Sequence, residues 1–135
     1  MHNLAFRRLI KYDAGRTGIT VPVQLKLVGR TVEFEAKIDT GSTNCIFARR
    51  IGEELGLDIE DGLPKRIGTA TGSFLTFEHG VTMSILDFNF DALACFAENE
   101  AFQTNVLGRY GFLMQVQLGL IDYDGKLYLD NYQVE

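Results

Sequence analysis

The chain has 135 residues, of which 46% are hydrophobic and 23% charged, so it can bury a core and is neither disordered nor fibrous. With 13 basic against 18 acidic side chains its net charge is -5, which argues against nucleic acid as a partner. The length fits a single domain, residues 1–135, and no apolar run approaches the ~18 residues of a membrane helix, so we expect a cytoplasmic protein without a membrane segment.

The first third of the chain predicts an antiparallel meander. Residues 4–12, 19–28 and 31–38 are rich in apolar and β-branched side chains, and turn residues separate them. The last two runs are separated by Gly29-Arg30, as in a tight hairpin. In residues 31–38 apolar and polar side chains alternate, so one face of this strand is expected to be buried just before Asp39.

The rest of the chain continues the pattern of short strands separated by turn residues. Its flexible stretch of small residues, 68–73, marks the tip of a second hairpin. Together these signals predict an all-β fold, a closed barrel or sandwich with one or two short helices. The expected elements are a short helix or turn at 48–57, a hairpin at 66–85, a strand at 88–96, a two-turn helix at 109–116, and strands at 118–123 and 126–130 that pair across Asp124-Gly125.

Two cysteines, Cys45 and Cys95, are too few for a disulfide framework and do not form a CxxC pair. We therefore interpret both as small buried hydrophobic residues. No metal site is expected from them.

The segment most informative about chemistry is the end of the third strand, where Ile38 is followed by Asp39, Thr40 and Gly41. This order places a carboxylate at the end of a rigid element, among backbone and hydroxyl donors that keep it ionised. Gly41 allows another backbone or a second carboxylate to approach closely. Taken alone, the tripeptide also fits an ordinary Asp-x-Gly turn.

The stretch KIDTGST at residues 37–43 resembles the catalytic loop of the retropepsin-like, or retroviral-type, aspartic proteases. Residues 105–109, Asn-Val-Leu-Gly-Arg, followed by Phe112-Leu113, resemble the second signature of that family. A Gly-rich hairpin of the flap kind lies between them, and the resemblance spans residues 19–129. It implies a single-domain bacterial or cellular member of the family, an aspartic endopeptidase that hydrolyses a polypeptide substrate without a metal or organic cofactor.

The family's mechanism needs two carboxylates that share one proton, and this chain supplies one. The segment Ile121-Asp122-Tyr123 has no Thr or Ser after its acid and is interpreted as part of a hairpin turn. The resemblance therefore implies a homodimer in which Asp39 of each subunit meets on a two-fold axis. The exposed edges of the terminal strands, 4–10 and 127–129, are expected where the family interleaves its termini into a dimer sheet.

The resemblance also assigns roles to the neighbours of Asp39. Thr40 would reach the partner's backbone, and Gly41 would present its carbonyl to the substrate. The hydroxyl of Ser42 would donate to the Asp39 carboxylate, which favours the ionised form and an acidic optimum. The flap residues expected to close over the substrate are Ala70, Thr71, Gly72, Ser73 and Phe74.

The second signature would support the catalytic loop from below, with Val106 and Leu107 as an apolar wall and Gly108 and Arg109 after it. Arg109 departs from the viral pattern, because the acid expected shortly after the catalytic triplet is replaced by Thr43 and Asn44. The sequence leaves three alternatives for the Arg109 side chain. It could form hydrogen bonds with neutral groups, pair with another acid such as Asp124, or lie in solvent.

Two other functions fit parts of this sequence. The order Asp-x-Gly-x-Thr also resembles the phosphate hairpin of actin-like and chaperone ATPases, but those folds need a chain more than twice as long. The second alternative is a catalytically silent retropepsin-like domain that serves as a dimerisation or peptide-binding module. A monomer that keeps Asp39 would favour this second alternative.

Overall fold

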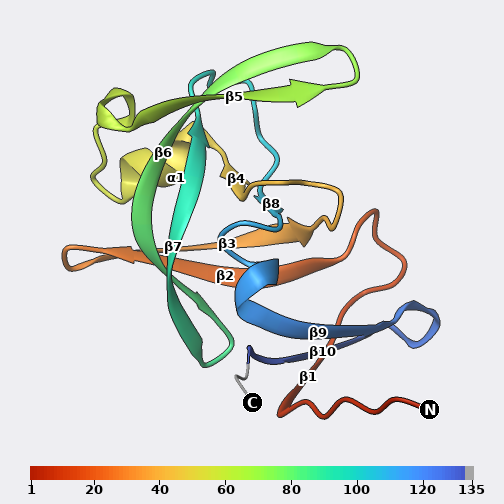
Figure 1. Ribbon diagram of the computed structural model, residues 1–135. Coiled ribbons are helices and arrows are strands. Elements are labelled where there is room, and N and C mark those ends of the chain that lie inside the picture. The colour runs from red at the N-terminus through yellow and green to blue at the C-terminus, as the bar shows by residue number, and fades with distance from the viewer. Residues whose placement is uncertain (133–135) are drawn as a thin grey trace.

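The computed structural model describes residues 1–132, and most of these residues form β-strands (Figure 1). The strands are β1 (Arg8–Lys11), β2 (Thr20–Leu27), β3 (Arg30–Ile38), β4 (Ile46–Phe47), β5 (Leu63–Thr69), β6 (Gly72–Ile85), β7 (Phe88–Ala97), β8 (Val106–Leu107), β9 (Val116–Ile121) and β10 (Lys126–Asn131). The helical elements are α1 (Arg49–Glu54) and the 3-10 turns η1 (Ile59–Asp61), η2 (Leu113–Gln115) and η3 (Asp122–Asp124). The predicted all-β class is confirmed.

The larger of the two sheets closes on itself. Its strand order is β2-β3-β8-β4-β7-β6-β5, and β2 also pairs with β6 through residues 24–26 and 82–84. Closure leaves few open strand edges and surrounds a single hydrophobic core. The largest fully buried side chains of this core include Phe47, Phe96, Phe112, Leu25, Ile51 and Met83.

Strand β3 shows how the sequence pattern positions the functional loop. Val32 and Ala36 are buried and the two glutamates between them are exposed, which confirms the predicted alternation. Phe34 is half-buried, and its ring contacts that of Phe47 edge-on at 5.0 Å between centroids. This packing fixes the strand immediately before Asp39.

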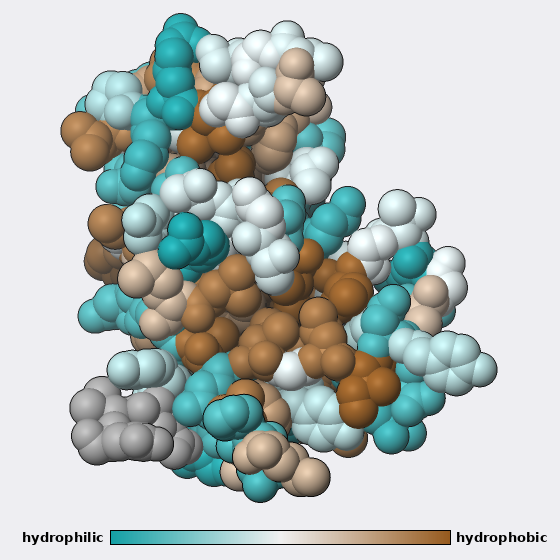
Figure 2. Space-filling view, turned by 45° about the vertical axis from the view of Figure 1, so that its right-hand side comes forward, coloured by the Kyte–Doolittle hydropathy of each residue, from teal (hydrophilic) through white to brown (hydrophobic). Residues whose placement is uncertain are grey.

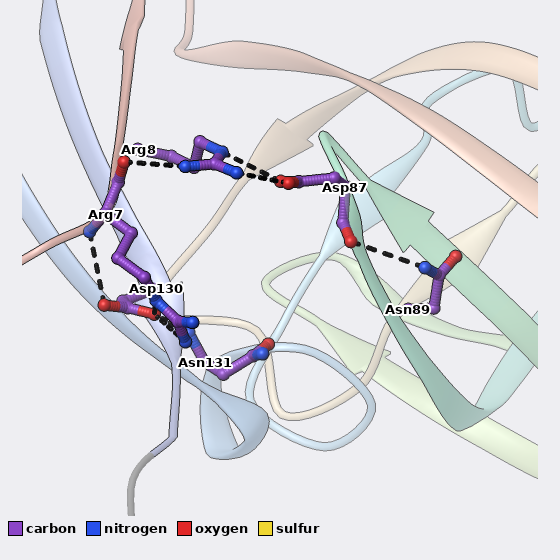
Figure 3. A network of polar contacts seen from close by, with 6 residues as sticks. All are labelled: Arg7, Arg8, Asp87, Asn89, Asp130 and Asn131. Atoms are coloured by element: carbon purple, nitrogen blue, oxygen red, sulfur yellow. Dashed lines mark hydrogen bonds and ion pairs between the residues drawn. The ribbon is translucent and has the colours of Figure 1, made fainter.

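The smaller sheet has the order β1-β10-β9, so both chain ends meet in it. Two arginines fasten its N-terminal strand (Figure 3): Arg7 forms a 2.7 Å ion pair with Asp130, and Arg8 pairs with Asp87 in the turn between β6 and β7. The hydrogen bond from Arg7 lowers the pKa of Asp130 below its ordinary value. The Arg7 pair lies within the small sheet, whereas the Arg8 pair joins this sheet to the large one.

Several local predictions are confirmed by the structure. Helix α1 lies within the expected segment 48–57, and the β9–β10 hairpin turns at Asp122–Asp124 and Gly125. The turn between β2 and β3 is shifted by one residue from the prediction and consists of Val28 and Gly29. Both have left-handed φ angles, 45° and 78°, as a two-residue type I′ hairpin turn requires.

Three other predictions are wrong. The N-terminal strand is shorter than residues 4–12. The expected helix at 109–116 is reduced to the 3-10 turn η2, because Gly111 takes a left-handed φ of 94° and interrupts the helical path. The C-terminal strand has no free edge, because β10 lies between β1 and β9.

Candidate active site

Asp39 follows the last residue of β3, where the backbone is held on both sides. The N–H of Ile38 donates to the carbonyl of Ile19 at 2.8 Å, and the N–H of Asp39 donates to the carbonyl of Leu107 at 3.0 Å. The neighbours at the end of the strand therefore fix the place from which the carboxylate projects. Asp39, Thr40 and Gly41 are all exposed in the single chain.

The carboxylate of Asp39 has one donor from its own chain. The N–H of Gly41 donates to Oδ1 at 2.9 Å, and the N–H of Ser42 donates to the Asp39 carbonyl at 3.1 Å. Within residues 1–132, Oδ2 makes no hydrogen bond and no second carboxyl group contacts it. One oxygen is thus oriented by the loop, and the other is available to a water molecule or to a shared proton.

Strand β8 passes between the two strands that the Asp39 loop connects. It runs parallel to the end of β3 and antiparallel to Ile46 of β4, so residues 39–45 arch around it. Beyond β8, the N–H groups of Arg109 and Tyr110 donate to the carbonyls of Ser42 and Thr43, each at 2.9 Å. The two segments that the sequence analysis singled out are therefore joined by backbone hydrogen bonds.

Gly108 lies where these two segments come closest. A Cβ atom at this position would lie 2.7 Å from the carbonyl oxygen of Ser42 and closer still to that of Asn44. Leu107 before it is fully buried, and Val106 is half-buried. The structure thus places Val106, Leu107 and Gly108 directly against the Asp39 loop.

The buried thiol of Cys45 completes the underside of the loop. Its Sγ accepts the N–H of Gly108 at 3.4 Å, and burial raises the pKa of this thiol to about 12. Cys45 and Cys95 are both free and buried, as predicted. At neutral pH a thiol with this pKa is protonated and acts as a packing group.

Ser42 and Arg109 differ from their expected contacts. The hydroxyl of Ser42 donates to the carbonyl of Asn44 at 2.7 Å, so it braces the loop instead of donating to the Asp39 carboxylate. The side chain of Arg109 is exposed and forms no ion pair with any acid, Asp124 included, in the described part of the chain. Its backbone N–H, not its guanidinium, connects it to the loop.

The flap hairpin consists of β5 and β6 and projects from the top of the molecule in Figure 1. Its two-residue tip is Ala70-Thr71, since Thr69 pairs with Gly72. The tip and Ser73 are exposed. Phe74 is half-buried instead and stacks on Phe102, with 4.9 Å between ring centroids and 25° between ring planes.

Phe102 and Asn105 are site residues whose contacts sequence reasoning missed. Phe102 anchors the flap hairpin to residues 98–105, and no pattern in that polar stretch signals such a contact. Asn105 lies directly before β8; its carbonyl accepts the N–H of Lys37 at 2.8 Å, and its side-chain Oδ1 accepts the N–H of Ala48 at 2.9 Å. The sequence signal that could have identified Asn105 was its position as the first residue of the second signature.

Two kinds of feature are absent from residues 1–132. Among residues 1–132 no group of three or more His, Cys, Asp or Glu side chains is placed to hold a metal ion. In the same part of the chain no helix has the length and apolar character needed to cross a membrane.

Comparison with known proteins agrees with this geometry. The chain is similar in fold to the EIAV protease complexed with the inhibitor HBY-793, with a TM-score of 0.57 and 18% identity over 74% of this chain and 88% of that chain. No curated protein matches the sequence. Residues 21–110 match the aspartyl protease family, a span that includes the Asp39 loop, the flap hairpin and β8. The chain therefore belongs to the aspartyl protease family and has the retropepsin-like fold.

Proposed function

We propose that the protein is an aspartic endopeptidase that works as a homodimer, with one Asp39 from each subunit. The observation that carries this proposal is the state of the Asp39 carboxylate in the single chain. It is exposed at the end of a fixed strand, one oxygen is oriented by Gly41, and the other makes no hydrogen bond within residues 1–132. This is the arrangement expected of half of a carboxylate pair.

The proposed chemistry uses two carboxyl groups and a water molecule. Two carboxylates about 3 Å apart cannot both be ionised, so the pair holds one proton. The ionised carboxylate removes a proton from the water as it attacks the peptide carbonyl carbon, and the protonated one donates to the carbonyl oxygen. In this proposal Thr40 contacts the partner's loop, and the carbonyl of Gly41 accepts a hydrogen bond from the substrate backbone.

The proposed substrate is a polypeptide in extended conformation. Such a peptide would lie between the Asp39 loops and the flap hairpins and form strand-type hydrogen bonds with their backbones. The exposed residues 70–73, the tip and the first two residues of β6, would close over it, with Phe74 directly after them. Ser42, Val106, Leu107 and Gly108 keep a supporting role in this proposal, through the loop contacts described above.

The test is cleavage of a diverse peptide pool between roughly pH 3.5 and pH 7, the range in which a shared-proton dyad operates. The wild-type protein should cleave and Asp39→Asn should not, because the amide removes the acid/base group while keeping the shape of the side chain. Asp61→Asn is the matched control, an exposed acid on η1 that lies outside the site, and it should cleave like wild type.

Two results would contradict the proposal. Cleavage by a purified Asp39→Asn protein would remove Asp39 from the mechanism. A folded wild-type protein that cleaves nothing in the pool would favour the catalytically silent module that binds peptides or dimerises.

A further inference from the structure

We propose that two copies of the chain associate by antiparallel pairing of β9 with β9 of the second copy. Their three-stranded sheets would thereby merge into one continuous sheet. The inference rests on the proposed function, because a lone Asp39 needs a second copy to complete the site. The proposed contact surface, the edge of β9, differs from the interleaved chain ends that the family resemblance implied.

The topology of the small sheet restricts where a second copy can add. The C-terminal strand β10 pairs with β1 on one side and with β9 on the other, so its backbone groups are used within the chain. Within this sheet, as the described residues form it, the outer edges of β1 and β9 are open. A partner that extends this sheet must therefore pair with one of these two strands.

The two open edges differ in charge. Strand β1 has the sequence RLIK, and charged side chains at an edge hinder pairing with another chain. Strand β9 has the sequence VQLGLI and contains no charged residue. An uncharged edge of six residues is the kind that needs a cover. The difference favours β9 as the strand that pairs.

The hydrogen-bond alternation shows which groups of β9 point outward. The N–H of Tyr132 donates to the carbonyl of Gln115 at 2.9 Å, which makes Gln115 and Tyr132 a hydrogen-bonded pair at the end of the ladder. Such pairs alternate along an antiparallel ladder, so every second residue of β9 points toward β10. The backbone groups of Val116, Leu118 and Leu120 accordingly face the open edge.

Apolar side chains surround this edge. Leu120 is 41% exposed, Ile121 is 45% exposed and Met114, just before β9, is 59% exposed. Figure 2 shows brown side chains gathered below the flap hairpin, on the side of the molecule that carries the β9–β10 hairpin. Burial of this patch against its own copy would add apolar area to the backbone pairing.

The same edge is connected to the Asp39 loop by two backbone hydrogen bonds. The N–H of Met114 donates to the carbonyl of Arg109 at 3.0 Å, and the N–H of Arg109 donates to the carbonyl of Ser42 at 2.9 Å. Antiparallel pairing of a strand with its own copy has two-fold symmetry, as an isologous dimer requires. A two-fold axis beside β9 would relate the two Asp39 loops by symmetry, as the shared site requires.

Amide hydrogen exchange at several protein concentrations tests the pairing directly. The amides of Leu118 and Leu120 should become protected as the dimer forms. The outward-facing amides of Leu9 and Lys11 on β1 are the internal control and should keep exchanging fast at every concentration. Concentration-dependent protection on β1, or its absence on β9, would overturn the proposal.

A pair of variants at one position separates backbone pairing from side-chain burial. Leu120→Pro removes the outward N–H without removing a β9–β10 hydrogen bond, whereas Leu120→Ala shortens the side chain and keeps that N–H. Circular dichroism confirms that each variant is folded, and analytical ultracentrifugation gives its dimer dissociation constant. The proline variant should dissociate at least about tenfold more readily than the alanine variant, since each dimer loses two hydrogen bonds.

The outcomes distinguish this interface from the proposed function. Equal dissociation constants for the two variants, with peptide cleavage retained, would overturn the β9 interface and leave the Asp39 dyad standing. A monomeric Leu120→Pro protein that cleaves as fast as the wild type would support the interface and contradict the shared dyad. A wild-type protein that remains monomeric would overturn both.

Discussion

The Asp39 loop and the tip of the β5–β6 hairpin would face the same substrate, but they are held in opposite ways. The loop is fixed by backbone hydrogen bonds to β8 and to the residues that follow it, above a buried thiol. The tip, Ala70-Thr71, is exposed, and the N–H of Thr71 donates to Oγ1 of Thr69 within the same hairpin, at 3.4 Å. A segment with few tertiary contacts opens at low free-energy cost, whereas a densely bonded one keeps its geometry. In the proposed enzyme, the loop would position the catalytic carboxylate and the hairpin would control substrate access.

Matched glycine substitutions should give the largest contrast between the two regions. At Gly108 an added methyl group meets two backbone carbonyl oxygens, so Gly108→Ala should lower the free energy of unfolding by about 3 kcal/mol or more. Gly68, on the hairpin, has no atom within 4 Å of an added Cβ and no left-handed φ. Gly68→Ala should change stability by less than about 0.5 kcal/mol.

Urea denaturation of both glycine variants measures this contrast. Equal losses of stability would mean that the loop is no more tightly packed than the hairpin. That result would contradict the contrast between a fixed Asp39 loop and a loosely held hairpin tip.

The aromatic stack at the base of the hairpin should have an intermediate effect. Phe74→Ala removes its contact with Phe102 and should lower the free energy of unfolding by about 1–2 kcal/mol, with a fall in kcat/KM. Phe102→Ala should cause a similar loss, and the double variant should reveal a coupling of about 0.5–1.5 kcal/mol. Fully additive losses in the double-mutant cycle would show that the rings do not stabilise each other.

The small sheet adds a pH-dependent contact to this comparison. Hydrogen bonding from Arg7 lowers the pKa of Asp130, so the ion pair stabilises the fold above about pH 4, and this stabilisation is lost as the pH falls through the lowered pKa. Asp130→Asn should therefore flatten the dependence of stability on pH below about pH 5.

The Asp87–Arg8 pair provides the matched control for this prediction. The Asp87 side chain is 58% exposed against 3% for Asp130, so solvent screens its pair more strongly. Asp87→Asn should flatten the curve less than Asp130→Asn does. Urea titrations at several pH values measure both curves. If Asp87→Asn flattened the pH dependence more than Asp130→Asn, burial of the Asp130 carboxylate would not be what strengthens its ion pair.

Local patterns were enough to predict the strand and the loop that carry the candidate site. The alternation that buries Val32 and Ala36 depends on neighbouring residues only, and so does the turn chemistry of Asp39, Thr40 and Gly41. The second signature was recognised by resemblance, and its backbone contacts with the first are present in the structure. The all-β class followed from the same short-range signals.

Features that depend on distant partners could not be predicted in this way. The Ser42 hydroxyl was expected to donate to the Asp39 carboxylate, and only the folded loop shows that the carbonyl of Asn44 accepts it. The free edge expected at the C-terminal strand depended on which strands pair, and β9 occupies it. At 109–116 the expected helix does not form, because Gly111 takes a left-handed φ and turns the chain toward β9.

Subunit mixing tests the central claim, that one Asp39 from each of two chains forms the active site. Wild-type protein is combined with an about threefold excess of Asp39→Asn protein under conditions that allow exchange, and peptide cleavage is followed. A dyad shared across the dimer predicts that activity per wild-type chain falls to about one quarter, because most wild-type subunits acquire an inactive partner. The same excess of Asp61→Asn should cause no loss. Unchanged activity per wild-type chain with the Asp39→Asn excess would contradict the account, because each chain would then act alone.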